Sequence, residues 1–197
     1  MKRSLLFFIA VSLYAAAAHA TTITYGAVLN GSSEFPANVS PGTGTALVTY
    51  DDIAHTLQFQ VLFSGLIGTT TASHIHCCTA VAGAGTAGVA TTTPSFALFP
   101  LGVTSGSLMN TLDLTLASSW NPSFITMHGG TTAGAEAFLA AGLADDKAYL
   151  NIHSTIYPGG EIRGFLTPVP EPATLSLLGI GLTGLVAARR RNRRARL

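Results

Sequence analysis

Alternation of apolar and polar residues is the feature that most constrains the fold of this chain. It is clearest in residues 55–63, where one face of the segment carries His55, Leu57, Phe59, Val61 and Phe63. The opposite face carries Thr56, Gln58 and Gln60. A period of two is that of a β-strand with one buried face, as in an antiparallel sheet.

Further strands are expected at residues 22–29, 46–50, 112–116, 148–153 and 161–166. Only residues 133–143 have a helical pattern, and residues 79–93 predict a long loop or a poorly specified strand pair. Short strands separated by turn signals predict an all-β fold, an antiparallel β-sandwich or barrel. Its core is expected to contain Leu57, Phe59, Val61, Leu150, Ile152 and Ile162.

The first twenty residues have the pattern of a secretory signal peptide. Lys2 and Arg3 precede an apolar stretch, and Ala18-His19-Ala20 is a small-x-small cleavage site. We therefore expect signal peptidase to remove residues 1–20. The alternative is a short N-terminal anchor that stays attached.

The C-terminal segment, residues 169–197, has a different pattern. Val169-Pro170-Glu171-Pro172 leads into an uncharged run that reaches Ala188, and six arginines follow. The seventeen residues from Pro172 to Ala188 are just long enough for a transmembrane helix, which needs about 17–25. The arginines would stay in the cytoplasm, which places the preceding chain outside it. A core helix with a basic tail is the alternative.

This tail resembles the PEP-CTERM sorting signal of Gram-negative bacteria. The Pro-Glu-Pro motif, the Gly-containing apolar stretch and the arginine cluster occur in the family's order. The resemblance implies recognition by an exosortase and removal of the hydrophobic tail. It also implies delivery to the cell surface or matrix of a bacterium that makes exopolysaccharide.

The segment between the two ends is acidic. Residues 21–168 keep only Lys147 and Arg163 against eight Asp and Glu residues, a net charge of −6. These 148 residues are enough for one domain with its own core. A domain of this charge has no basic surface for binding nucleic acid.

Residues 21–168 also resemble the CHRD domain, which is named from the animal protein chordin. The matching segments, in family order, are residues 29–36, 42–46, 64–66, 73–76, 148–153 and 157–164. The resemblance implies an immunoglobulin-like or superoxide-dismutase-like β-sandwich and no established activity. The chain departs from the family in Cys77-Cys78 and in His128, which has no counterpart in the pattern.

Three histidines form the candidate site. His74 and His76 should point the same way, because residues i and i+2 of a strand share a face. His153 lies on the polar face of another expected strand, with Tyr149 and Asn151. If the two strands are neighbours, three imidazoles converge, and neutral imidazole suits zinc or copper. The alternative is that these histidines bond to the backbone or to Asn151.

The other chemically notable residues have more ordinary interpretations. His55 and His128 are expected to be surface residues. Glu161 and Arg163 should share a strand face, where a surface ion pair or a cross-strand contact is expected.

Cys77 and Cys78 are the only cysteines, and an oxidising compartment permits a disulfide between them. Neighbouring Cα atoms are about 3.8 Å apart across a trans peptide, below the usual disulfide range of about 4.4 Å and upward. A vicinal disulfide would therefore be strained. Metal ligation beside His76, an intermolecular bridge and free thiols are the alternatives.

The sequence contains no G-x-S-x-G elbow, no P-loop and no dinucleotide fingerprint. It therefore favours an exported surface or matrix protein that is not an enzyme, with exopolysaccharide or envelope components as partners. The alternative is an extracytoplasmic module that binds zinc or copper. A dismutase-type enzyme is disfavoured, because its two-metal site needs more histidines than the five that remain after signal cleavage.

Overall fold

The structure is a computed structural model and describes residues 22–170. The expected signal peptide, residues 1–20, lies outside the described residues. So do Glu171, Pro172, the apolar run and the arginine cluster of the tail. Within residues 22–170, no helix is long and apolar enough to cross a membrane.

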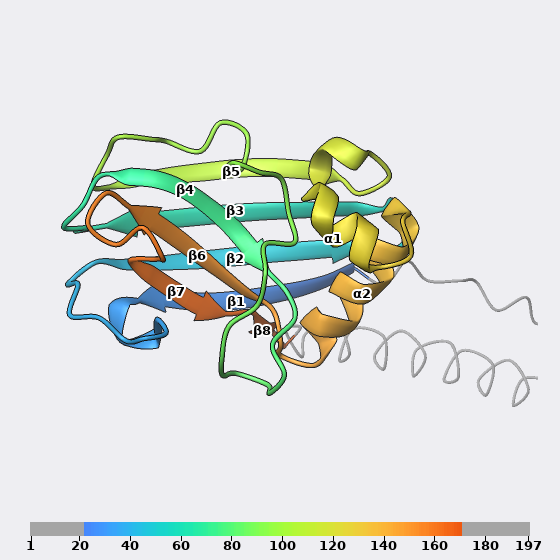
Figure 1. Cartoon of the computed structure of the whole chain (residues 1–197), viewed down its shortest axis with the longest axis horizontal. Coiled ribbons are helices and arrows are strands. Elements are labelled where there is room, and N and C mark those ends of the chain that lie inside the picture. The colour runs from blue at the N-terminus through green and yellow to red at the C-terminus, as the bar shows by residue number, and fades with distance from the viewer. Residues whose placement is uncertain (1–21, 171–197) are drawn as a thin grey trace, which may run out of the picture.

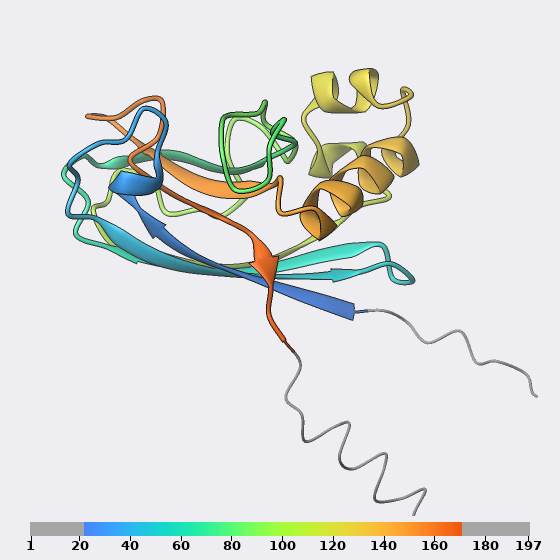
Figure 2. The same cartoon turned by 90° about the horizontal axis from the view of Figure 1, so that it is seen from below.

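All the strands belong to one antiparallel sheet with the order β4-β6-β7-β1-β2-β3-β5, and β8 pairs with β1 beside this path. The bounds are β1 Thr22–Asn30, β2 Thr43–Asp51, β3 Thr56–Ser64, β4 Thr70–His76, β5 Gly106–Asp113, β6 Tyr149–Ser154, β7 Ile162–Phe165 and β8 Thr167–Pro168. The sheet curls on itself, so that β4, β6 and β7 cross over β1, β2, β3 and β5 (Figure 1). The edge-on view shows the two layers of the resulting sandwich (Figure 2). The all-β prediction is confirmed.

The core lies between the layers. The six residues predicted for it, from β3, β6 and β7, are each at most 2 % exposed. The long connection from β4 to β5 adds Phe96 and Phe99, whose rings lie 4.3 Å and 5.5 Å from those of Phe59 and Phe63. These two aromatic pairs close the side of the sandwich between β4 and β5.

Two helices, α1 Pro122–Met127 and α2 Thr132–Ala144, cover one end of the larger layer on its inner side (Figure 2). Each has a side-chain N-cap, since Asn121 accepts from the Ser123 N–H and Thr131 accepts from the Gly134 N–H. Glu136 of α2 accepts a hydrogen bond from the Tyr50 hydroxyl at 3.0 Å and lies 3.0 Å from His55 Nδ1. The 3₁₀ turns are η1 Gly31–Ser33 and η2 Ala117–Ser119.

Two details of the predicted strands are wrong. The strand expected at residues 112–116 is β5, which ends at Asp113 because the Asp113 carboxylate accepts from the Thr115 backbone and hydroxyl and turns the chain. His55 does not continue the apolar face of β3. It lies in the β2–β3 turn with a φ of 52°, where its side chain is half-exposed.

Truncation of the β3 core face should destabilise the domain. Leu57 and Phe59 are fully buried, so we expect Leu57→Ala or Phe59→Ala to lower the free energy of unfolding by about 2–5 kcal/mol. Gln58→Ala, on the exposed face between them, should change it by no more than about 0.5 kcal/mol. Urea denaturation measures all three. Equal effects of the buried and exposed truncations would contradict the assigned faces.

Candidate metal centre

The candidate site lies on the face of β4, β6 and β7 that points away from the core. Register pairs His74 with Asn151 and His76 with Tyr149 across β4 and β6, and Asn151 with Arg163 across β6 and β7. Paired residues share a face, and alternation sends Ile75, Leu150 and Ile152 to the opposite, inner face. The connection from β4 to β5 runs along the free edge of β4, bridging His76 to Val89. His74 and His76 are consequently buried on this polar face.

Each histidine is held by a backbone carbonyl. His74 Nε2 lies 2.6 Å from the Pro94 oxygen, His76 Nδ1 lies 2.8 Å from the Ala87 oxygen, and His153 Nδ1 lies 2.9 Å from the Pro158 oxygen. A carbonyl oxygen can only accept, so these three nitrogens carry the ring protons. In the neutral rings, lone pairs remain on His74 Nδ1, His76 Nε2 and His153 Nε2.

These free nitrogens converge. His74 Nδ1 lies 3.3 Å from His153 Nε2, and one ligand nitrogen from each of the three residues lies within 4.8 Å of the other two. Because the other nitrogen of each ring carries the proton and donates it to a carbonyl, His74 Nδ1 and His153 Nε2 face each other as two acceptors. His76 Nε2 is buried and has no hydrogen-bond partner among the described residues. The cluster therefore presents three lone pairs to one small volume.

Burial keeps the rings neutral. It lowers the pKa of both His74 and His76 to about 4, although the carbonyl bonds act in the opposite direction. Burial also lowers the pKa of His153. At neutral pH the three imidazoles are thus in the protonation state that a metal ion requires.

Polar and aromatic neighbours surround the cluster. The Tyr149 ring stacks on His76 at 4.9 Å, and the Arg163 guanidinium lies 4.7 Å from the centre of the Tyr149 ring. Arg163 also donates to the carbonyls of Ser33 and Gly85 and lies 3.7 Å from the Glu34 carboxylate. The position and stacking of the His76 ring are therefore fixed by β6, β7 and the loops over them.

The surface ion pair expected of Glu161 and Arg163 is wrong. Both side chains are buried, and Arg163 pairs with Glu34 instead. The other expectation, a cross-strand contact, is met by Arg163 over the Tyr149 ring of β6. Glu161 precedes β7, and its carboxylate accepts from the Ser40 hydroxyl at 2.6 Å and from the Ile67 N–H at 2.5 Å. The hydrogen bond from Ile67 holds the loop after β3 against the turn before β7.

Cys77 and Cys78 follow β4 directly, and in the structure their sulphur atoms are bonded to each other across a cis peptide bond. They face helix α2, where a Cβ atom on Gly142 would collide with both sulphurs. The converging ligand atoms come from His74, His76 and His153, and neither sulphur is among them.

The other two histidines of residues 22–170 lie apart from the cluster. His55 pairs with Glu136, and His128 stacks on Phe138 of α2 with ring centres 3.7 Å apart. The expected alternative, that the three cluster histidines bond to the backbone, is confirmed, but the sequence did not predict which carbonyls accept: those of Ala87, Pro94 and Pro158. Backbone acceptors have no residue-type signature, so only the proximity of the Ala- and Gly-rich loop to the histidine pair could have suggested them.

Comparison with known families identifies the domain. Residues 25–166 match the CHRD domain. The chain belongs to the CHRD domain family. No curated protein sequence and no solved structure matches the chain.

Residues 168–191 match the PEP-CTERM protein-sorting motif. The motif begins within two residues of the end of the CHRD match, so the CHRD domain is followed at once by its sorting segment. The motif marks the CHRD protein as an exported protein that exosortase processes and that passes through a membrane-anchored intermediate to the cell surface.

Burial of neutral imidazoles should make the stability of the metal-free CHRD protein depend on pH. In the unfolded chain, imidazoles take up protons near about pH 6.5, whereas His74 and His76 do so only near 4. Between these values the unfolded state binds more protons, so stabilisation present above about pH 6.5 is lost as the pH falls toward 4. Burial raises the pKa of Glu34 to about 7, so this carboxyl opposes part of the fall in the same window. Urea denaturation should show the remaining fall, and His76→Gln should make it shallower.

His55→Gln is the matched control, because hydrogen bonding to Glu136 raises the pKa of His55 and its loss cannot flatten the slope. A His76→Gln protein that loses stability as steeply as the wild type would contradict the neutral, buried state of this ring.

Proposed function

We propose that this CHRD protein is a non-catalytic surface protein whose domain binds a transition-metal ion, zinc or copper, through His74, His76 and His153. The observation that carries the proposal is the convergence of three ring nitrogens whose partner nitrogens are all bonded to carbonyls. Neutral imidazole is a preferred ligand of both metals.

The geometry suits one ion with little rearrangement. Two nitrogens that each lie about 2.0–2.1 Å from a tetrahedral zinc ion are separated by about 3.3 Å. The His74 and His153 nitrogens already lie at 3.3 Å, and all three lie within 4.8 Å. A small rotation of the rings brings the third ligand to the same ion.

The groups behind the ligands support the same function. A metal-binding histidine almost always donates its other ring N–H to a carbonyl or carboxylate, which orients the ring and raises its basicity. All three histidines have such a bond. Asn151 Oδ1, on the same sheet face, is buried with no partner among the described residues, and it offers an acceptor for a further ligand such as water.

The distribution of the histidines favours binding over dismutase-type catalysis. A two-metal site would need additional imidazoles beside the cluster. His55 instead pairs with Glu136, and His128 stacks on Phe138, both away from the cluster. Within residues 22–170 the group of possible metal ligands consists of the three cluster histidines alone. We therefore assign the site to metal capture or to stabilisation of the fold by metal.

The proposal also includes the processing, the location and the partner of the mature protein. Signal peptidase would remove residues 1–20, and exosortase would remove the tail at Val169-Pro170-Glu171-Pro172. The product would then reside at the cell surface or in the extracellular matrix of an exopolysaccharide-producing Gram-negative bacterium. Exopolysaccharide or another envelope component would be its partner there. Nucleic acid is disfavoured, because residues 21–168 carry a net charge of −6.

Calorimetric titration with zinc and with copper tests the site. Wild-type protein should bind one ion, and His76→Ala should weaken binding by more than about 100-fold, because even partners behind the ligands contribute 10–100-fold. Bound metal should also raise the melting temperature as its concentration rises. His128→Ala is the matched control and should bind as the wild type does. Equal binding by His76→Ala and wild type would place the ion elsewhere.

Processing is tested by replacing Pro170-Glu171-Pro172 with alanines. The native product should begin near Thr21 and end near residues 170–172, whereas the variant should stay in the membrane with its arginine cluster attached. Mass spectrometry of both proteins, purified from the producing bacterium, measures the two ends. A wild-type surface product that keeps the arginine cluster would contradict the processing scheme.

A further inference from the structure

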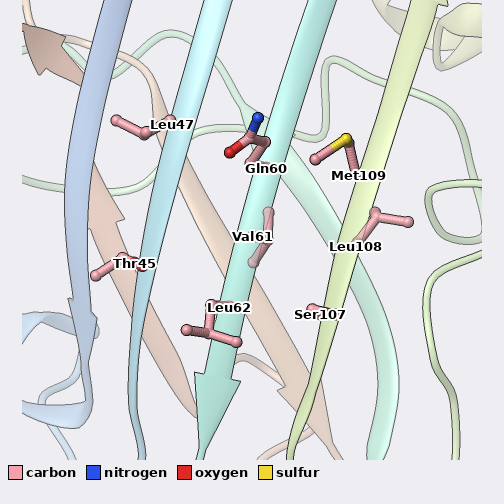
Figure 3. A pocket seen from close by; sticks show the side chains of 8 residues that line it. All are labelled: Thr45, Leu47, Gln60, Val61, Leu62, Ser107, Leu108 and Met109. Carbon is pink, nitrogen blue, oxygen red and sulfur yellow. The ribbon is translucent and has the colours of Figure 1, made fainter.

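The outer face of β1, β2, β3 and β5 carries an apolar patch that no described element covers. Its residues are Val28, Leu47, Leu62 and Met109, one from each strand. Val28, Leu62 and Met109 are 68 %, 62 % and 67 % exposed. In register, Thr45 lies between Val28 and Leu62. Gln60 lies between Leu47 and Met109. The four apolar side chains are therefore diagonal neighbours on adjacent strands. Figure 3 shows Leu47, Leu62 and Met109 of this apolar patch around Gln60.

This face is nearly free of charge. In the four strands the only charged residues are Asp51 and Asp113. Both lie at the same end of the layer, because each is paired in register with Thr56. The remaining outward side chains near the apolar patch are Thr, Ser and Gln. Asp51 and Asp113 together carry −2, so the other parts of residues 21–168 carry −4 of the net charge of −6.

The chain leaves the domain beside the apolar patch. β8 pairs with β1 at Tyr25 and Gly26, and the Val169 N–H donates to the Thr24 oxygen at 2.8 Å. Residues 167–170 line a shallow hollow together with Gly26, Val28 and Leu47, all on the outer face. In Figure 2 the last coloured residues pass below the larger layer, on the side opposite the helices and β6.

We propose that this outer face lies on the lipid surface while the protein is anchored and awaits its exosortase. Only Glu171 separates Pro170 from the uncharged run of the sorting segment. One residue spans at most about 3.6 Å, so the face next to Pro170 is held at the bilayer surface. Tethering at this distance gives a high effective concentration, at which a small apolar patch suffices for contact.

The chemistry of the apolar patch favours lipid over a second copy of the chain. Exposed apolar residues among uncharged hydroxyl and amide groups match the boundary between headgroups and acyl chains. Two domains of net charge −6 repel each other, whereas a zwitterionic lipid surface does not repel them. Contact would present the chain at residues 169–172 to a protease of the membrane in one orientation.

The test uses the chain with its C-terminal tail intact in phosphatidylcholine nanodiscs that contain a nitroxide-labelled lipid. An environment-sensitive fluorophore is attached at Met109→Cys on the apolar patch or at Ala82→Cys, an exposed site on the connection beside the other layer. Labelling is done without reductant, because Cys77 and Cys78 are bonded to each other. The emission of the probe at position 109 should shift to shorter wavelength, and the lipid nitroxide should quench it. The emission of the probe at position 82 should neither shift nor be quenched.

A Leu47→Thr/Leu62→Thr variant keeps strand-forming residues and should lose the shift and quenching of the Met109 probe while its circular dichroism stays unchanged. Equal quenching of the two probes, or quenching that persists in the double variant, would overturn the proposal. A Met109 shift that appears without lipid and grows with protein concentration would identify the face as an interface between two copies and would also overturn it.

Discussion

In β6, the alternation that sends Leu150 and Ile152 into the core also sends Asn151 and His153 to the opposite face, which loops cover. Buried polar groups need partners, because an unsatisfied donor or acceptor in a dry environment costs about 1–3 kcal/mol. The loop carbonyls of Ala87, Pro94 and Pro158 meet this demand for the ring N–H groups. Among the described residues, the second nitrogen of each ring receives no hydrogen bond from a donor and keeps its lone pair. This difference between the two nitrogens of each ring creates the candidate metal site.

The same burial favours the proposed binding of a metal ion. Protonating these histidines would place positive charges close together in a desolvated region, and the low pKa values of His74 and His76 express that cost. A single cation bound by several neutral imidazoles avoids the repulsion and satisfies the lone pairs together. The acidic character of the domain favours the approach of such an ion. In the proposed function, binding of the ion would therefore stabilise the loops over the sheet.

Much of this arrangement was predictable from the sequence, for reasons that differ between elements. The period-two pattern placed Leu57, Phe59 and Val61 in the core, and the i, i+2 spacing placed His74 and His76 on one face. The length of β5 and the position of His55 were mispredicted, because Asp113 and the β2–β3 turn end the alternation locally. The Arg163–Glu34 pair and the loop carbonyls depend on segments far apart in the chain, which no local pattern specifies.

The most direct test of the metal-centre account is the zinc X-ray absorption spectrum of the purified CHRD protein after loading with one equivalent of zinc. We expect a first shell dominated by imidazole nitrogens at about 2.0–2.1 Å, with the outer-shell scattering typical of histidine. This shell should vanish in His74→Ala/His76→Ala protein. A shell with sulphur at about 2.3 Å, or one made of oxygen alone, would contradict the assignment of the three histidines.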